Sequence, residues 1–86
     1  MKELTVEITN ESGLHAPPAT AFTQLAAKFA SKLTIAANGK TADAKSILTV
    51  LTLGATKGTS VVLTADGADE DDALAALSEF LTTNHD

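Results

Sequence analysis

Hydrophobic and polar residues alternate along three stretches of the chain, and this alternation predicts the strands of a β-sheet. The first stretch is residues 2–8, KELTVEI, and another is residues 59–67, TSVVLTADG, which ends in an Asp-Gly turn. A period of two is that of a strand with one buried face. Residues 32–44, KLTIAANGKTADA, predict two antiparallel strands joined at Asn38-Gly39, since both turn residues readily adopt positive φ.

Other stretches have the apolar spacing of helices. From Pro18 onward the spacing i, i+3, i+4, i+7 predicts a helix with one face on a core, carried by Phe22, Leu25, Ala26 and Phe29. Residues 69–81, DEDDALAALSEFL, predict a last helix with a stripe of leucines. Residues 45–54, KSILTVLTLG, predict a short helix with Ser46 as its N-cap and Gly54 as its stop. That helix is apolar nearly all round, so it has more apolar side chains than one buried face can cover.

The order of these elements is β-α-β-β-α-β-α, which predicts an α+β fold. We expect the strands to form one four-stranded antiparallel sheet and the three helices to cover one of its faces. The length of 86 residues and the apolar content of 44% suit one small domain over residues 1–86. No apolar run is long enough to cross a bilayer and the first residues lack a signal-peptide pattern, so we expect a cytoplasmic protein without membrane partners.

Charge and cysteine content exclude several classes of function. The net charge is −5, the chain has no arginine, and phenylalanine is its only aromatic residue, so a nucleic-acid partner is not expected. No cysteine is present, which excludes disulfides, thiolate chemistry and cysteine-based zinc sites. The acidic residues 66–72 suit the first turn of a helix better than a calcium loop, so no metal is expected.

His15, in the stretch GLHAPPAT, is the main candidate for chemistry. It lies just before the helix that starts near Pro18, where unpaired backbone N–H groups and the helix dipole favour an anion such as phosphate. A histidine titrates near neutrality and can accept a group covalently. The alternative for a lone histidine is a solvated loop residue without a function.

The segments GLHAPPA and AKSILTVLTLGATKGT, residues 13–19 and 44–59, resemble the signatures of the histidine-containing phosphocarrier (HPr) family of the sugar phosphotransferase system. The resemblance implies an open-faced β-sandwich. It implies a phosphoryl carrier, not an enzyme by itself and without a cofactor, which accepts phosphate on Nδ1 of His15. The phosphoryl group would come from phosphoenolpyruvate through enzyme I and pass to enzyme IIA domains.

Pro17 departs from the family pattern, which has an arginine that helps to bind the phosphoryl group. Proline provides neither the guanidinium nor a backbone N–H, and no other arginine can replace it. Pro18 should keep Pro17 out of the helix, so the helix is expected to start at or after Pro18. The phosphate-binding groups left are those around Ala16 and Pro18, and we expect slower or less stable phosphorylation of His15.

The resemblance also assigns partner docking and regulation. It implies a docking patch formed by Thr20, Ile47, Leu48 and Leu51, for which the alternative is core packing. It makes Ser46 a phosphorylation site for an HPr serine kinase, which is compatible with an N-cap role. Phosphate on Ser46 would place negative charge at the edge of the patch and could control docking onto a transcriptional regulator.

Two further interpretations stay open at this point. One is a regulatory HPr-like interaction protein controlled by phosphorylation of Ser46, which Pro17 favours, whereas the retained His15 favours the carrier. The other is a small-ligand regulatory domain of ferredoxin-like topology, which the element order alone would permit. For all of these we expect a monomer.

Overall fold

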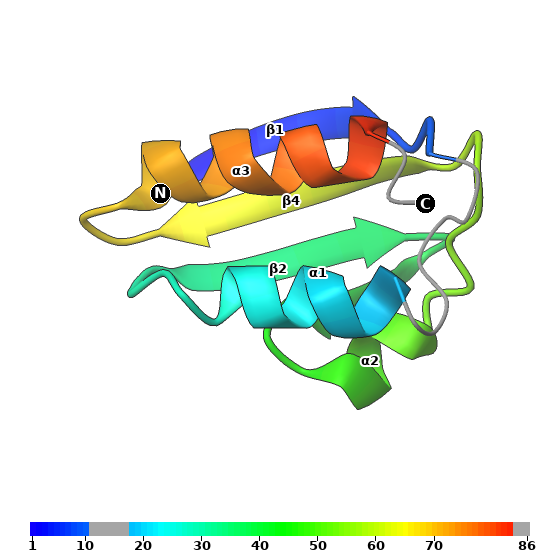
Figure 1. Ribbon diagram of the computed structural model, residues 1–86, viewed down its shortest axis with the longest axis horizontal. Coiled ribbons are helices and arrows are strands. Elements are labelled where there is room, and N and C mark those ends of the chain that lie inside the picture. Colours follow the sequence, from blue (N-terminus) through cyan, green and yellow to red (C-terminus); the bar gives the residue numbers. More distant parts are fainter. Residues whose placement is uncertain (11–17, 84–86) are drawn as a thin grey trace.

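The computed structural model describes residues 1–10 and 18–83, and Figure 1 shows the arrangement of its elements. The predicted element order and the α+β fold are confirmed. The elements are β1 (Lys2–Glu7), α1 (Pro18–Ala26), β2 (Lys32–Ala37), β3 (Lys40–Asp43), α2 (Ile47–Leu51), β4 (Ser60–Asp66) and α3 (Glu70–Thr82).

The strands form one antiparallel sheet in the order β1-β4-β2-β3. β4 pairs with β1 on one side and with β2 on the other, so a single residue such as Leu63 lies opposite both Leu4 and Ile35. The β2–β3 hairpin turns at Asn38 and Gly39, whose φ values are +53° and +77°. The turn predicted from these two residues is confirmed.

Alternation within the strands places apolar side chains on one face of the sheet. Leu33 and Ile35 of β2 and Val61 and Leu63 of β4 are almost fully buried, while Thr34 lies on the other face, opposite Thr64. The period-two pattern therefore predicts the buried face correctly, because a strand turns successive side chains to opposite sides.

The helices cover that buried face. α3 contacts β1 and β4, α1 contacts α3 and α2, and α2 contacts β3. Figure 1 shows α1 and α3 side by side in front of the sheet. Phe22 of α1 and Phe80 of α3 join the two helices with ring centroids 5.7 Å apart at an interplanar angle of 66°, a favourable edge-to-face geometry.

Two helices end earlier than their apolar patterns predict. α1 stops at Ala26. The N–H of Ala27 still donates four residues back, but those of Lys28 and Phe29 donate only three residues back, which tightens the chain after the helix. Phe29 still packs partly buried against the core. α2 ends at Leu51, although Gly54, with a φ of +61°, marks the end of the turns that follow, as predicted.

The carbonyl groups at the carboxyl end of each helix accept a hydrogen bond from a side chain elsewhere in the chain. Lys45 Nζ donates to the carbonyl of Phe29, just after α1, and Asn38 Nδ2 to that of Leu53, just after α2. Asn10 Nδ2 donates to the carbonyl of Phe80 in α3. These side chains tie the chain at or just after the helix ends to loops and turns that flank the strands.

Candidate functional site

The predicted phosphate-accepting segment is only partly within the described residues. His15, Ala16 and Pro17 lie outside them. Pro18 is described and is the first residue of α1 as the described residues have it, which agrees with a helix start at or after Pro18; the residues before it lie outside the described range, so this stays a prediction. Pro18 suits this first position because its fixed φ matches a helix and the N–H that it lacks has no partner there.

The first turn of α1 presents backbone N–H groups rather than charge. Helix α1 has no acidic residue in its first turn and no basic residue in its last turn. Thr20, one of the predicted docking residues, is exposed on this turn. The helix start is therefore electrically favourable to an anion only through its backbone groups and dipole.

Helix α2 leaves large apolar side chains in solvent. Leu48 is 74% exposed and Leu51 is 38% exposed, whereas Val50 is fully buried. Ile47 is partly buried and packs against the core. The prediction that this helix is too apolar for one buried face is confirmed, and the predicted docking residues divide into the exposed Leu48 and Leu51 and the mainly structural Ile47.

Ser46 is the N-cap of α2, with an extended backbone, but its side chain makes no capping hydrogen bond. The predicted capping bond is therefore wrong. The polar contacts that fix this turn come from its neighbours: Asp43 Oδ1 accepts the N–H of Lys45, and Thr49 Oγ1 donates to the carbonyls of Asp43 and Ser46. Ser46 is half-buried.

The chain on the amino side of the undescribed segment is held firmly. Ile8 exchanges backbone hydrogen bonds with the chain before β4, donating to Thr59 and accepting from Gly58 at 2.7 Å. The N–H groups of Thr9 and Asn10 both donate to the carbonyl of Leu81. We call this region the loop end: residues 8–10, the last turn of α3 and the start of α1, which lie together on the right of Figure 1.

Asn10 is a residue that the sequence does not single out. The composition of the segment TNESG, residues 9–13, indicates a loop. Asn10 is nevertheless only 2% exposed, and its Nδ2 lies 3.3 Å from the carbonyl oxygen of Phe80. The only local signal for this role is an amide side chain directly after a strand. Its burial depends on α3, which is distant in sequence, and no local pattern reveals it.

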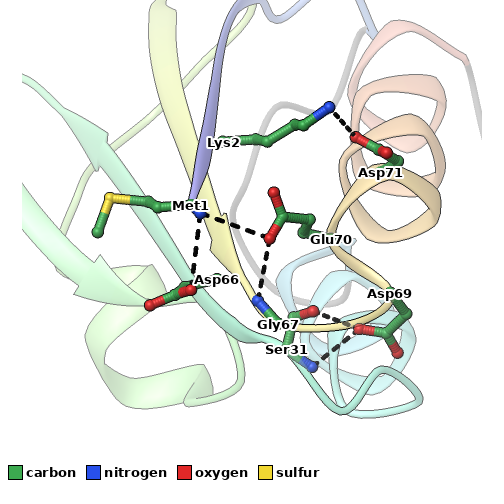
Figure 2. Close-up of polar contacts among 8 residues, drawn as sticks. All are labelled: Met1, Lys2, Ser31, Asp66, Gly67, Asp69, Glu70 and Asp71. Carbon is green, nitrogen blue, oxygen red and sulfur yellow. Dashed lines mark hydrogen bonds and ion pairs between the residues drawn. The ribbon is translucent and has the colours of Figure 1, made fainter.

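The opposite end of the molecule is rich in carboxylates, as Figure 2 shows. Asp69 accepts hydrogen bonds from the N–H groups of Ala30 and Ser31 at 2.8 and 2.9 Å and from the Ser31 hydroxyl. The Ser31 hydroxyl and then the Ala30 N–H hold the pKa of Asp69 below its usual value. We call this region, which includes residues 66–71, Ser31 and residues 1–2, the acidic end.

The start of β1 is also bound to the acidic end. The Met1 amine lies 3.7 Å from Asp66 and 3.5 Å from Glu70, and Lys2 Nζ lies 2.9 Å from Asp71 (Figure 2). Hydrogen bonding to Asp71 and its charge raise the pKa of Lys2. Apart from the half-buried Glu70 these groups are exposed, so the pairs order the strand end without adding much stability.

Two grooves on the part of the chain that the structure describes are lined by residues other than the predicted site residues. One of about 250 Å³ lies between α1 and α3 and is lined by Leu25, Ala76, Glu79, Phe80 and Thr83. Another of about 220 Å³ lies on the open face of the sheet and is lined by Met1, Lys32, Thr34, Thr64 and Asp66. Within residues 1–10 and 18–83, no group of three His, Asp or Glu side chains could hold a metal ion, and no helix is long and apolar enough to cross a membrane.

Comparison with known families and structures gives a consistent result. Residues 2–83 match the family described as PTS HPr component phosphorylation site. The chain is 44% identical to an HPr of Thermoanaerobacter tengcongensis, solved as HPr-C-His, with a TM-score of 0.89 over 94% of this chain and 91% of that one. It is 34% identical to an HPr of Bacillus anthracis, with a TM-score of 0.91 over 93% of this chain and 95% of that one.

A regulatory relative is also similar. The chain is 38% identical to Crh, a catabolite repression protein of Bacillus subtilis, with a TM-score of 0.74 over 94% of this chain and 93% of that one. That Crh structure is described as an intertwined dimer with a swapped domain.

Proposed function

The chain belongs to the HPr family of the phosphotransferase system, and on this basis we propose that it is a phosphoryl carrier that accepts phosphate on His15 from enzyme I and donates it to enzyme IIA domains. HPr proteins are carriers rather than catalysts. The observation that most supports the proposal is the exposure of Leu48, at 74%, on a helix that contacts α1, which begins three residues after His15. Large apolar side chains in solvent are typical of a surface that partners cover.

In the proposed transfer, Nδ1 of His15 attacks the phosphorus atom. The bond from nitrogen to phosphorus forms as the bond from phosphorus to enzyme I breaks. In donation to enzyme IIA, the bond from His15 to phosphorus breaks as a bond from phosphorus to the acceptor forms. Such transfers depend on positioning and on stabilising the charge of the phosphoryl oxygens. The N–H groups in the first turn of α1 supply part of that stabilisation.

Pro17 makes this site weaker than the family pattern. Without the arginine at that position, the chain offers the phosphoryl group no guanidinium, and we propose that phosphorylation is slower for this reason. A Pro17→Arg variant should be phosphorylated faster, by up to about 10²-fold, since one charge-assisted donor has an effect of that order at a transition state. Equal rates for parent and variant would contradict the role given to Pro17.

Enzyme I and enzyme IIA are proposed to dock on Thr20, Leu48 and Leu51, while Ile47 packs α2 against the core. Thr20, Leu48 and Leu51 are uncharged and exposed, so the association is expected to depend mainly on burial of apolar surface. This role belongs to the cytoplasm, where we propose the protein acts.

The experiment that tests the carrier proposal is an intact-mass measurement after incubation with phosphoenolpyruvate and enzyme I. The parent should gain one acid-labile phosphoryl group, lose it when an enzyme IIA acceptor is added, and gain none when His15 is replaced in His15→Ala. No mass gain in the parent, with enzyme I active on another HPr, would refute the carrier function.

A second candidate function is regulation through phosphorylation of Ser46. The half-buried Ser46 has no side-chain capping bond to lose, and the likeness to Crh supports a regulatory role for this fold. Phosphate on Ser46 would add negative charge beside Ile47 and Leu48 and alter docking on a transcriptional regulator. An active HPr serine kinase should add one phosphate to the parent and none to Ser46→Ala, and an unmodified parent would count against this function.

We also propose that the protein is a monomer. β1 pairs with β4 of its own chain over six residue pairs, from Lys2↔Ala65 to Glu7↔Ser60. The Crh structure is a swapped dimer, so the proposal needs a direct measurement. Light scattering after size exclusion should give the mass of one chain, 8.8 kDa, and a mass twice as large would contradict it.

A further inference from the structure

Phe80 of α3 contacts both flanks of the segment that carries His15. On the amino side, its carbonyl accepts a hydrogen bond from Asn10 Nδ2 at 3.3 Å. On the carboxyl side, its ring packs against Phe22 of α1, with centroids 5.7 Å apart. Asn10 and Pro18 are the residues immediately before and after residues 11–17, and Phe22 lies about one helical turn beyond Pro18.

From these contacts we propose that Asn10 and Phe80 are positioning residues for His15, because together they fix the separation and orientation of the two chain ends from which residues 11–17 extend. The inference rests on the proposed carrier function and adds residues to it that do not touch the phosphoryl group. Transfer between two proteins requires the attacking nitrogen to be aligned with the phosphorus atom, and a misplacement of about 1 Å can lower the rate by 10²-fold.

The surroundings of Asn10 make its position well defined. The residue is 2% exposed, its own N–H and that of Thr9 donate to the carbonyl of Leu81, and Ile8 is bound on its other side to Gly58 and Thr59. A buried amide that donates to a fixed carbonyl holds its backbone in one orientation, because leaving either group unpaired is unfavourable. Residues 8–10, on the amino side of residues 11–17, are therefore fixed in one position relative to α3.

The carboxyl flank is fixed through buried aromatic rings. Phe22 is fully buried and Phe80 is 8% exposed, so their edge-to-face contact is part of the core between α1 and α3. A change at Phe80 is thus transmitted to α1 close to its first turn. No charged side chain takes part in either of these two contacts.

The acidic end supplies a matched control. Ser31 is 1% exposed and its hydroxyl is bound to Asp69 at the start of the same helix α3. A helix of 13 residues is about 20 Å long, so Ser31 lies far from Asn10 and Phe80, although its part-buried hydrogen bond also holds α3. Ser31→Ala and Asn10→Ala each remove one such contact, from opposite ends of α3.

The test is steady-state phosphorylation of the full chain by enzyme I, with kcat and KM measured separately. Asn10→Ala should lower kcat about tenfold with KM within about twofold of the parent, because the docking residues on α2 are unchanged. Ser31→Ala should leave both constants within about twofold. Phe80→Leu keeps an apolar side chain and the carbonyl that accepts from Asn10, and it should lower kcat about threefold.

A second readout needs no phosphoryl transfer. In ¹H NMR titrations, Asn10→Ala should shift the pKa or the imidazole resonances of His15, with His85 as the internal reference, whereas Ser31→Ala should not. A parental kcat in Asn10→Ala overturns the inference. Equal losses of kcat in Asn10→Ala and Ser31→Ala also overturn it, because they indicate a general effect of stability. If the parent accepts no phosphate, the carrier proposal itself fails, and an unchanged His15 titration in Asn10→Ala then refutes the positioning role independently.

Discussion

Helix α3 is bound at both of its ends to distant parts of the chain, and the two ends use different chemistry. At the acidic end, Asp69 accepts hydrogen bonds from Ala30 and Ser31, and the start of β1 adds ion pairs. At the loop end, the carbonyls of Phe80 and Leu81 accept neutral N–H donors from residues 9–10.

This difference indicates a division between stability and function. Carboxylates suit the amino end of a helix, where the dipole is positive, and there they can stabilise the fold away from the loop end, where the described chain stops on either side of the segment with the proposed acceptor His15. Fixed negative charge beside His15 would oppose a phosphoryl group, and the contacts that hold Asn10, Phe22 and Phe80 carry none. We therefore expect changes at the acidic end to alter stability alone, and changes at the loop end and on α2 to alter transfer or docking.

The largest effect on stability is expected for Gly67→Ala at the acidic end. A Cβ at position 67 would lie 2.5 Å from Ser31 Oγ and 2.7 Å from Ser31 Cα, so the backbone must move. Overpacking of this kind should lower the free energy of unfolding by about 1–3 kcal/mol, measured by urea denaturation. Ala68→Ser is the control for the neighbouring exposed position. A loss of kcat for His15 phosphorylation in the folded Gly67→Ala protein would contradict the division.

The largest effect on partner binding is expected for Leu48→Asp. The side chain is 74% exposed, so the free energy of unfolding should change by less than about 0.5 kcal/mol. The KM for enzyme I should rise about tenfold, because a carboxylate replaces an apolar contact in the proposed interface. Thr5→Asp, on the open face of the sheet, adds the same charge elsewhere and should leave KM unchanged. A similar rise for both variants would assign the effect to net charge.

A smaller effect, with a defined pH dependence, is expected for Ser31→Ala. Loss of the buried Ser31 hydroxyl should lower the free energy of unfolding by about 1 kcal/mol at neutral pH. The folded-state pKa of Asp69 lies below its ordinary value of 3.8, so the stabilisation is present above that value and is lost as the pH falls through the folded-state pKa.

The pH dependence is measured by urea denaturation of parent and Ser31→Ala from neutral to strongly acidic pH. The difference between the two should be constant above about pH 5, because Asp69 is then ionised in both states of both proteins, and should shrink in more acidic solution. A difference that stays constant down to the most acidic pH, or that grows there, would contradict the assigned ionisation.

The smallest effect is expected for Lys2→Gln. Lys2 and Asp71 have side chains that are 55% and 72% exposed, and exposed pairs of this kind contribute little. The midpoint of urea unfolding should be the same as in the parent within error. A clear loss of stability would show that charge at the acidic end acts more strongly than its exposure indicates.

The sequence predicts the fold well because the strand pattern is local. Alternation in residues 2–8, 32–44 and 59–67 identifies the strands and their buried face, and Asn38-Gly39 identifies the hairpin. The early end of α1 and the absent capping bond of Ser46 were not predictable, since the backbone tightens after Ala26 and the turn before α2 is fixed by Asp43 and Thr49.

The candidate site is predictable only in part. The excess apolar character of residues 47–51 correctly predicts exposed leucines on α2. The burial of Asn10 depends on contact with Phe80, 70 residues away in sequence, so no local spacing indicates it. The roles of His15, Pro17 and Ser46 stay predictions from the family pattern.

The measurement that tests this division most directly is a titration of ¹⁵N-labelled protein with enzyme I, followed by amide chemical shifts. We expect the largest changes in amide shift at Thr20, Leu48 and Leu51 and at Asn10, and unchanged shifts at Ser31, Gly67 and Asp69. Changes centred on Ser31, Gly67 and Asp69, with α2 unaffected, would contradict it.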